Sequence, residues 1–167
     1  MIKRATLMDA ADEILRLAAD YKGKPHREMT LDGLVYGYLF AKHGVKRQYK
    51  VRNKSKKRPD RIDFRQPAPN PVVIEFAVRT KKHKNEVYGT QNSDELRKLA
   101  KQVKAKARYL LLLDLSEETA LTKANLKKTY DKINAGKGKF PRTSVRVLYV
   151  HPHRADSFHF LWQPWKK

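Results

Sequence analysis

The segment RYLLLLDLS, residues 108–116, constrains the fold of this chain more than any other, because its apolar side chains are consecutive. Successive side chains of a strand point to opposite faces of a sheet. An apolar run without alternation is therefore typical of a strand in the middle of a sheet that is covered on both faces. It predicts helices on each side of that strand.

Hydrophobic periodicity elsewhere predicts those helices and the neighbouring strands. Thr30 and Ser93 are the expected N-caps, and Asp94 and Glu95 lie in a first turn, where the helix dipole favours acids. Helices are expected at residues 9–21, 31–43, from 93 onward and 121–133, and strands at 45–51, 62–64, 72–78 and in the segments SVRVLYV and SFHFLWQPW. The order α-α-β-β-β-α-β-α-β-β predicts one α/β domain with a mixed central sheet flanked by helices.

The chain is strongly basic. It has 38 Lys and Arg residues against 17 Asp and Glu, which gives a formal net charge of +21. Self-repulsion of that size opposes compaction unless a polyanion shares the charge, so nucleic acid is the expected partner. No basic amphipathic helix with aromatic anchors indicates a membrane partner. The absence of cysteine excludes disulfides and thiolate zinc sites. The apolar runs are too short for a signal peptide or a membrane span, so we expect a soluble, cytoplasmic protein.

The basic residues gather in three clusters, at residues 46–58, 79–84 and 97–104. Such surfaces bind phosphate with strong salt dependence and little sequence information. The alternative is an ordinary solvated charged surface. The predicted nucleic-acid contacts are Arg47, Lys50, Arg52, Lys56, Lys57, Arg58, Lys81, Lys82, Lys84, Arg97 and Lys101.

Two of the few acids stand inside apolar strands of the segment PDRIDFRQPAPNPVVIEFAV, residues 59–78. Strand alternation puts Ile62 and Phe64 on one face and Asp63 on the other. In the next strand it puts Ile74 and Phe76 on one face and Glu75 on the other. If the two strands pair, the carboxylates of Asp63 and Glu75 converge on one side of the sheet. Two carboxylates that close cannot both ionise cheaply without a cation between them, and hard oxygen ligands suit Mg²⁺. The alternative is that each acid pairs with one of the many basic residues.

The same segment resembles a known family. PDRIDF and VVIEFAV, preceded by a helix ending in FAKHG and followed by the helix SDELRKLAKQ, resemble the PD-(D/E)XK nuclease superfamily, which includes restriction endonucleases and archaeal Holliday junction resolvases. The resemblance covers roughly residues 31–115, the αβββαβ core of that fold.

The resemblance implies one restriction-endonuclease-like domain over residues 1–167. Its core lies at about 28–116, with an N-terminal helix before it and a C-terminal helix and strands after it. The implied activity is Mg²⁺-dependent hydrolysis of phosphodiester bonds in DNA, with Mn²⁺ as a substitute, by an endonuclease of restriction, repair or recombination type. Members of the family often dimerise to cut two strands, so a homodimer is one arrangement that the resemblance allows.

The resemblance also assigns roles to particular acids. Glu75 matches the second acid of the motif, and the first is Asp63 or Asp60. Asp63 lies inside the apolar strand, as the family's metal ligand usually does, and is the preferred assignment, whereas Asp60 keeps the literal Pro-Asp pair. An acid from the preceding helix often joins the metal in this family, and Asp32 is placed for that role, with Glu28 as the second choice. The alternative for these two is that they stabilise the helix N-terminus.

One position departs from the family pattern. The lysine expected two residues after Glu75 is replaced by Ala77. In this family that lysine orients the attacking water or stabilises the charged transition state. Arg79, on the same strand face, and Lys98, on the following helix, are the candidates for its catalytic role, although Arg stays protonated and cannot act as a base. If neither replaces it, the chain is a degenerate member that binds or assembles on nucleic acid without cutting it.

Overall fold

The computed structural model describes residues 2–20, 28–51, 60–80, 85, 87–102, 104–116, 118–131 and 143–162. Within them the chain forms four helices and six strands in the order predicted from the sequence. The helices are α1 (Arg4–Asp20), α2 (Glu28–His43), α3 (Ser93–Ala100) and α4 (Lys123–Asp131). The strands are β1 (Lys46–Val51), β2 (Asp60–Gln66), β3 (Val72–Arg79), β4 (Ala107–Asp114), β5 (Thr143–His151) and β6 (Arg154–Trp162).

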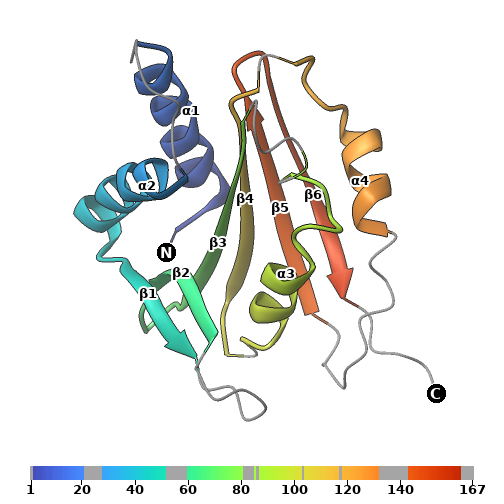
Figure 1. Ribbon diagram of the computed structural model, residues 1–167. Helices are drawn as coiled ribbons and strands as arrows, with labels where there is room; N and C mark the ends of the chain where they lie inside the picture. Colours follow the sequence, from blue (N-terminus) through green and yellow to red (C-terminus); the bar gives the residue numbers. More distant parts are fainter. Residues whose placement is uncertain are drawn as a thin grey trace, which may run out of the picture.

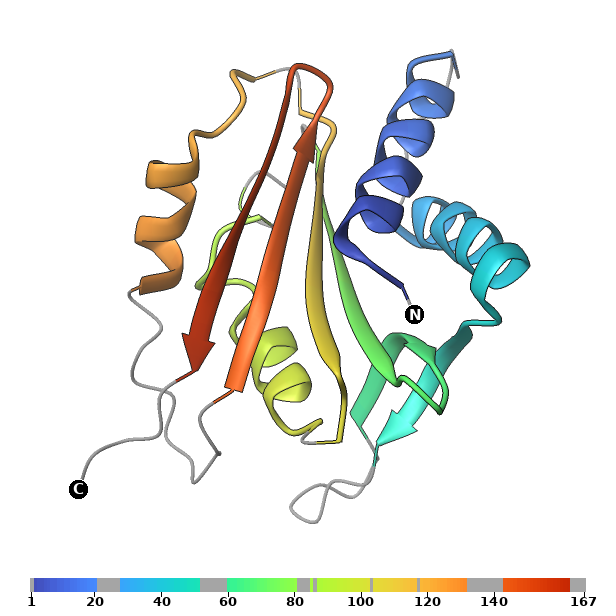
Figure 2. The ribbon, with the colours of Figure 1, turned by 180° about the vertical axis from the view of Figure 1, so that it is seen from behind.

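All six strands form one mixed sheet in sequence order (Figure 1). β1, β2 and β3 are antiparallel neighbours, β3, β4 and β5 are parallel, and β6 returns antiparallel to β5. Helices α1 and α2 lie on one side of the sheet and α3 and α4 on the other (Figure 1 and Figure 2). This is the α/β architecture expected from the sequence. In the described part of the chain, no helix has both the length and the apolar character needed to cross a membrane.

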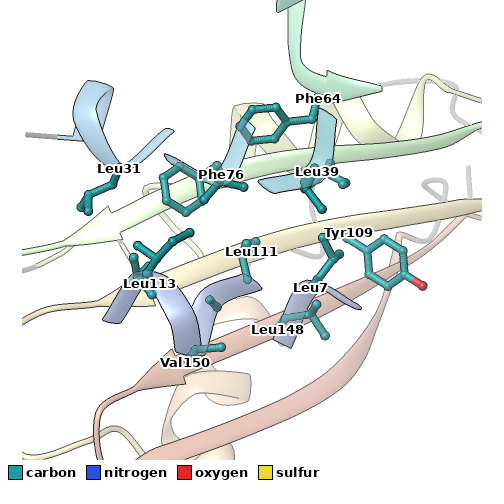
Figure 3. Close-up of a cluster of buried hydrophobic side chains, with 14 of the residues drawn as sticks. Leu7, Leu31, Leu39, Phe64, Phe76, Tyr109, Leu111, Leu113, Leu148 and Val150 are labelled. Carbon is teal, nitrogen blue, oxygen red and sulfur yellow. The ribbon is translucent and has the colours of Figure 1, made fainter. Parts of the chain in front are cut away.

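Strand β4 is the central strand that the apolar run predicted. It pairs in parallel with β3 on one side and with β5 on the other. Leu111 and Leu113 pack in a cluster with residues of α1 and α2 (Figure 3), whereas Leu110 and Leu112 belong to the cluster on the side of α3 and α4. All four are completely buried. Burying a leucine side chain contributes about 1.5–3 kcal/mol, so this strand stabilises both halves of the core.

The first turns of α1 and α2 differ from the prediction. α1 begins at Arg4 rather than at residue 9, and α2 begins at Glu28, so Thr30 lies inside the helix and is not its N-cap. An apolar stripe marks the buried face of a helix and says little about an exposed first turn. The end of α2 confirms the prediction: Gly44 has a φ of 60°, and its N–H donates to the carbonyl oxygen of Phe40 at 3.0 Å. Glycine adopts this left-handed conformation without strain.

The start of α3 corrects a second cap. Asn92 is the N-cap, and Ser93, which the sequence favoured, is the first helical residue. The Asn92 side chain makes no capping hydrogen bond; its Nδ2 donates to the carbonyl oxygen of Tyr88, 3.1 Å away. Asn and Ser are both favoured at N-caps, so residue type does not choose between adjacent positions. Asp94 and Glu95 do lie in the first turn, as predicted.

Candidate active site

The two strands that carry the acids separate where Asp63 lies. The ladder between β2 and β3 ends at the pair Phe64–Ile74. At the next residue the side chain replaces the main chain as the partner of β3, because Oδ2 of Asp63 accepts a hydrogen bond from the N–H of Phe76 at 2.9 Å. The carboxylate of Asp63 is thereby held against β3, beside the position of Glu75.

Strand β2 does not keep the alternation that the sequence predicted. Ile62 belongs to the buried cluster on the side of α3 and α4, and Phe64 to the cluster on the side of α1 and α2. The pairing of β2 with β3 stops at Phe64, so Ile62 lies beyond the part of β2 that pairs with β3 and packs in a different cluster from Phe64. The expected parity is therefore wrong for β2, and the hydrogen bond to Phe76 fixes the place of Asp63 instead.

Glu75 faces α3 and is completely buried, with 0% of its surface exposed. The β3 residues of the same parity, Val73 and Ala77, belong to the cluster on the side of α3 and α4. Lys98 of α3 donates a hydrogen bond from Nζ to Oε2 of Glu75 at 2.8 Å. The Lys98 side chain is 20% exposed, so this ion pair joins the core to the surface.

Two further groups hold Lys98. Its Nζ donates to the main-chain oxygen of Arg61 on β2 at 3.2 Å, and it lies 3.9 Å from Oε1 of Glu95, one turn earlier on α3. Leu96 and Leu99 pack α3 onto the sheet and set the position of the helix. The ammonium group is thus bound by β2, β3 and α3 together.

Burial and charge shift the pKa values of this cluster. Burial raises the pKa of Glu75 well above its usual value, and the negative charge of Asp63 raises it further, while Lys98 lowers it. Burial is the largest single influence on Lys98 and lowers its pKa, but the combined attraction of Glu75, Asp63 and Glu95 outweighs burial, so the pKa of Lys98 is raised. Burial is also the main cause of the raised pKa of Glu95. Lys98 is therefore a stable positive charge, and any cation placed beside Glu75 favours its ionised form.

Within the described residues, one carboxylate oxygen of Glu75, Oε1, is buried and accepts no hydrogen bond from a donor group. The carboxyl groups of Glu75 and Asp63 are close enough to hydrogen-bond when one of them carries a proton. An unsatisfied buried polar group costs about 1–3 kcal/mol, and a cation bound by Glu75 and Asp63 would remove that cost. Two carboxylates with water and phosphate oxygens suit Mg²⁺. The described residues contain no group of three or more His, Asp or Glu side chains that could hold a metal. An ion here would take its other ligands from elsewhere.

Arg79 lies in a different place. It is 3% exposed and forms ion pairs with Asp114 of β4, 2.9 Å away, and with Glu118. Arg79 and Asp114 end their strands and are opposite one another in the parallel register, so this network lies at the carboxyl ends of β3 and β4. Four residues along a strand span about 13 Å, which separates Arg79 from Glu75. Of the two candidates for the role of the missing lysine, Lys98 contacts Glu75 and Arg79 pairs with other acids. The catalytic role predicted for either residue stays a prediction.

Several predicted residues lie outside the described part of the chain. Asp32 and Glu28 belong to α2 and Asp60 to β2, but their side chains are outside it, as is the side chain of Lys50. Their predicted roles stay predictions. The predicted nucleic-acid contacts that lie wholly outside the described residues are Arg52, Lys56, Lys57, Arg58, Lys81, Lys82 and Lys84.

The remaining basic candidates lie on β1 and near α3. Arg47 is exposed, with its guanidinium carbon 5.9 Å from the centre of the Tyr36 ring. Arg97 forms an ion pair with Asp94 on the exposed side of α3. Lys101 follows that helix and is half-buried. Arg97 and Lys101 come from the same helical segment as Lys98, so a phosphate backbone at the acids would pass close to that segment.

Sequence reasoning missed two partners of Lys98. The helix dipole explains Glu95 in the sequence, but its spacing of three residues from Lys98 is an additional signal, because such residues are neighbours on a helix surface. The carbonyl oxygen of Arg61 has no sequence signal. Its contact depends on how β2 lies against α3, which is a property of the tertiary fold.

Comparisons with known proteins leave the family open. No protein-family model matches the chain, and no curated protein matches it in sequence. Among solved structures, one described as the crystal structure of SSO0001 aligns with 99% of this chain and 71% of its own, at 11% sequence identity and a TM-score of 0.31. A likeness at that level carries no argument, so the functional case depends on the chain's own residues.

Proposed function

We propose that this protein is a Mg²⁺-dependent nuclease with a restriction-endonuclease-like core that hydrolyses phosphodiester bonds of DNA. The observation that carries the proposal is the 2.8 Å contact between Nζ of Lys98 and Oε2 of Glu75. Ala77 leaves β3 without the lysine of the PD-(D/E)XK pattern, and α3 supplies a lysine to the same acid from another element. Asp63 and Glu75, on neighbouring strands, would be the two acids of that pattern.

Asp63 and Glu75 would hold Mg²⁺ through their carboxylate oxygens, with Mn²⁺ as a substitute. Asp32 is the third acid that the resemblance implies, although its helix, α2, packs on the side of the sheet opposite to the side that Glu75 faces. A bound Mg²⁺ polarises a phosphodiester and lowers the pKa of a bound water. Oε1 of Glu75 is buried and accepts no hydrogen bond from a donor in the described part of the chain, which supports this assignment, since a carboxylate in that setting gains from a cation. The chain's own contribution is to hold the two carboxylates together and to keep Glu75 away from bulk water.

Lys98 would stabilise the negative charge that develops on the phosphate. Its raised pKa keeps it protonated at neutral pH, so it acts as a fixed positive charge and not as a base. The contacts with the Arg61 carbonyl oxygen and with Glu95 limit its motion. A positive group that is already oriented needs little rearrangement when the phosphate arrives.

The net charge supports a nucleic-acid substrate. A chain with a net charge of +21 gains from binding a polyanion. Arg47 lies on β1, and Arg97 and Lys101 come from the helical segment that carries Lys98. Contacts of this kind read the phosphate backbone and carry little sequence information. Cutting both strands of a duplex would use a second copy of the chain, so a homodimer belongs to the same proposal.

Ala77, in place of the lysine of the family pattern, favours a second candidate function that involves no catalysis. The chain would then be a nucleic-acid-binding or assembly module that has kept the nuclease fold and lost the chemistry. In that case the ion pair between Lys98 and Glu75 only neutralises a buried acid. Such a module binds nucleic acid and does not cut it with any divalent cation, which is what separates it from a nuclease.

Cleavage assays distinguish the two candidates. Supercoiled plasmid, branched DNA and single-stranded DNA are incubated with the protein in Mg²⁺, Mn²⁺ or EDTA. The nuclease predicts cleavage with either metal, none in EDTA and none by Glu75→Ala. The matched control Asp94→Asn, which removes an exposed acid of α3, should cut like the wild type. DNA binding without cleavage of any form under either metal refutes the nuclease, and cleavage restored by Ala77→Lys would then identify a degenerate nuclease fold.

A further inference from the structure

Lys98 stands between two acids. Its Nζ is 2.8 Å from Oε2 of Glu75 and 3.9 Å from Oε1 of Glu95, and it donates to the main-chain oxygen of Arg61 at 3.2 Å. Charge-assisted hydrogen bonds between ammonium and carboxylate groups are about 2.8 Å long. A movement of Nζ by about 1 Å toward Oε1 of Glu95 would bring these two atoms within that distance, and the long, flexible lysine stem permits it. Glu95 is thus placed to take part in an exchange of partners, in which it replaces Glu75.

A divalent cation at Glu75 makes this exchange favourable. Two cations on one buried carboxylate repel each other strongly, because the protein interior screens charge less than water does. The buried Oε1 of Glu75, which accepts no hydrogen bond within the described residues, is the available position for such a cation. When ionised, Asp63, Glu75 and Glu95 outweigh Lys98 by two negative charges, which balances one divalent cation.

We propose that Glu95 is a positioning residue that receives the ammonium group of Lys98 when a divalent cation takes over Glu75. This inference rests on the proposed metal site and adds a partner to it. Without Glu95, the incoming ion would meet an uncompensated positive charge. With Glu95, Lys98 remains charged and close to the ion, and it does not have to leave the site. Glu95 therefore affects the affinity of the ion through Lys98 and not by contacting the ion.

Mn²⁺ binding in the absence of nucleic acid tests the inference, with free Mn²⁺ measured by electron paramagnetic resonance. Glu95→Gln should weaken Mn²⁺ binding about tenfold, the scale of one partly screened unit charge. Asp94→Asn is the matched control: it removes the same charge from the same turn of α3, but its partner is Arg97. It should change Mn²⁺ affinity less than about twofold, as expected for an exposed charge. Glu75→Gln should abolish binding.

A double-mutant cycle shows whether Glu95 acts through Lys98. In Lys98→Met, which has no ammonium group to receive, adding Glu95→Gln should change Mn²⁺ affinity no more than the control does. An equal loss of affinity in both backgrounds overturns the inference, because Glu95 would then act on the ion directly. An unchanged affinity in Glu95→Gln alone also overturns it. If the wild type itself binds no Mn²⁺, the proposed metal site fails and this inference fails with it, which is a distinct result.

Thermal unfolding of each variant checks that the site is still assembled. Glu95 is 29% exposed, and glutamine has nearly the same shape, so Tm should stay close to that of the wild type. If Glu95→Gln lowers Tm, Glu95→Asp is the second variant, because it keeps the negative charge on the same turn of the helix. Glu95→Asp should bind Mn²⁺ more tightly than Glu95→Gln, and equal affinities for the two variants would overturn the inference.

Discussion

Lys98→Met removes the positive partner of a carboxylate that has no contact with water. The side chain of Glu75 is 0% exposed and that of Lys98 is 20% exposed, so solvent screens their ion pair only weakly. Removing one partner of a buried ion pair costs about 3–5 kcal/mol of the free energy of unfolding. Because Lys98 keeps some exposure, we expect the lower end, about 3 kcal/mol near pH 8. Methionine preserves most of the apolar packing of the lysine stem.

The loss depends on pH because Glu75 can bind a proton. Its pKa is raised by burial and by Asp63, and losing Lys98 raises it further. An acid with a raised native pKa keeps a proton that the unfolded chain has released, so stability falls as the pH rises from about 4.5 through the native pKa. The slope is at most about 1.36 kcal/mol per pH unit. The free energy of unfolding of Lys98→Met should therefore be close to that of the wild type near pH 5, and it should drop below the wild-type value as the pH rises.

Urea denaturation in EDTA between about pH 5 and pH 8, followed by circular dichroism, measures this dependence. The double variant Lys98→Met/Glu75→Gln has no buried carboxyl group at position 75, so it should regain much of the lost stability near pH 8. A difference between Lys98→Met and the wild type that is constant with pH, or that shrinks as the pH rises, would refute the reasoning. Ionisation of Glu75 would then not be the cause of the loss.

Four further outcomes are expected. Glu75→Ala should keep or raise DNA affinity in EDTA, measured by fluorescence anisotropy, because it removes a negative charge near the phosphates; a large loss would contradict a metal-holding role. Wild-type DNA affinity should fall with salt by a slope of log K against log salt of about −0.9 per phosphate contacted, and a flat response would exclude a polyanion partner. Asp114→Asn should lower the free energy of unfolding by about 3 kcal/mol, because it removes one carboxylate partner of the buried Arg79; unchanged stability in urea would show that the network contributes little. Leu111→Ala should cost about 2–5 kcal/mol in the same assay, and a smaller loss would mean that β4 is not the centre of the core.

The order of elements was readable from the sequence because each helix or strand has a local pattern. The apolar run around Leu111 predicts that β4 is not an edge strand. Its pairing with β3 on one side and β5 on the other confirms this. The starts of the helices were not readable. Asn92 and Ser93 are both good N-caps, and the backbone path of the preceding turn decides which of them begins the helix.

The sequence indicates which acids form the candidate site, but it does not indicate which basic residue contacts them. Asp63 and Glu75 stand out because carboxylates are rare in apolar strands. Choosing between Arg79 and Lys98 required the register of β3 with β4, which pairs Arg79 with Asp114. It also required the packing of α3 on the sheet. Both are contacts between distant parts of the chain, and a single sequence carries no local signal for them.

The lysine that pairs with Glu75 is carried by a helix packed on the sheet, α3, and not by the strand of the acid. A lysine two residues after an acid on one strand cannot move away from it, whereas Lys98 stays beside Glu75 only while α3 packs on the sheet. Leu96, Leu99 and Ala100 are the buried residues of that short helix. Short peripheral elements open locally at a lower free energy than a central sheet does. Each opening of α3 separates the ammonium group from Glu75 while the strands remain folded, so amide hydrogen exchange in α3 reports the fraction of molecules in which the ion pair is broken.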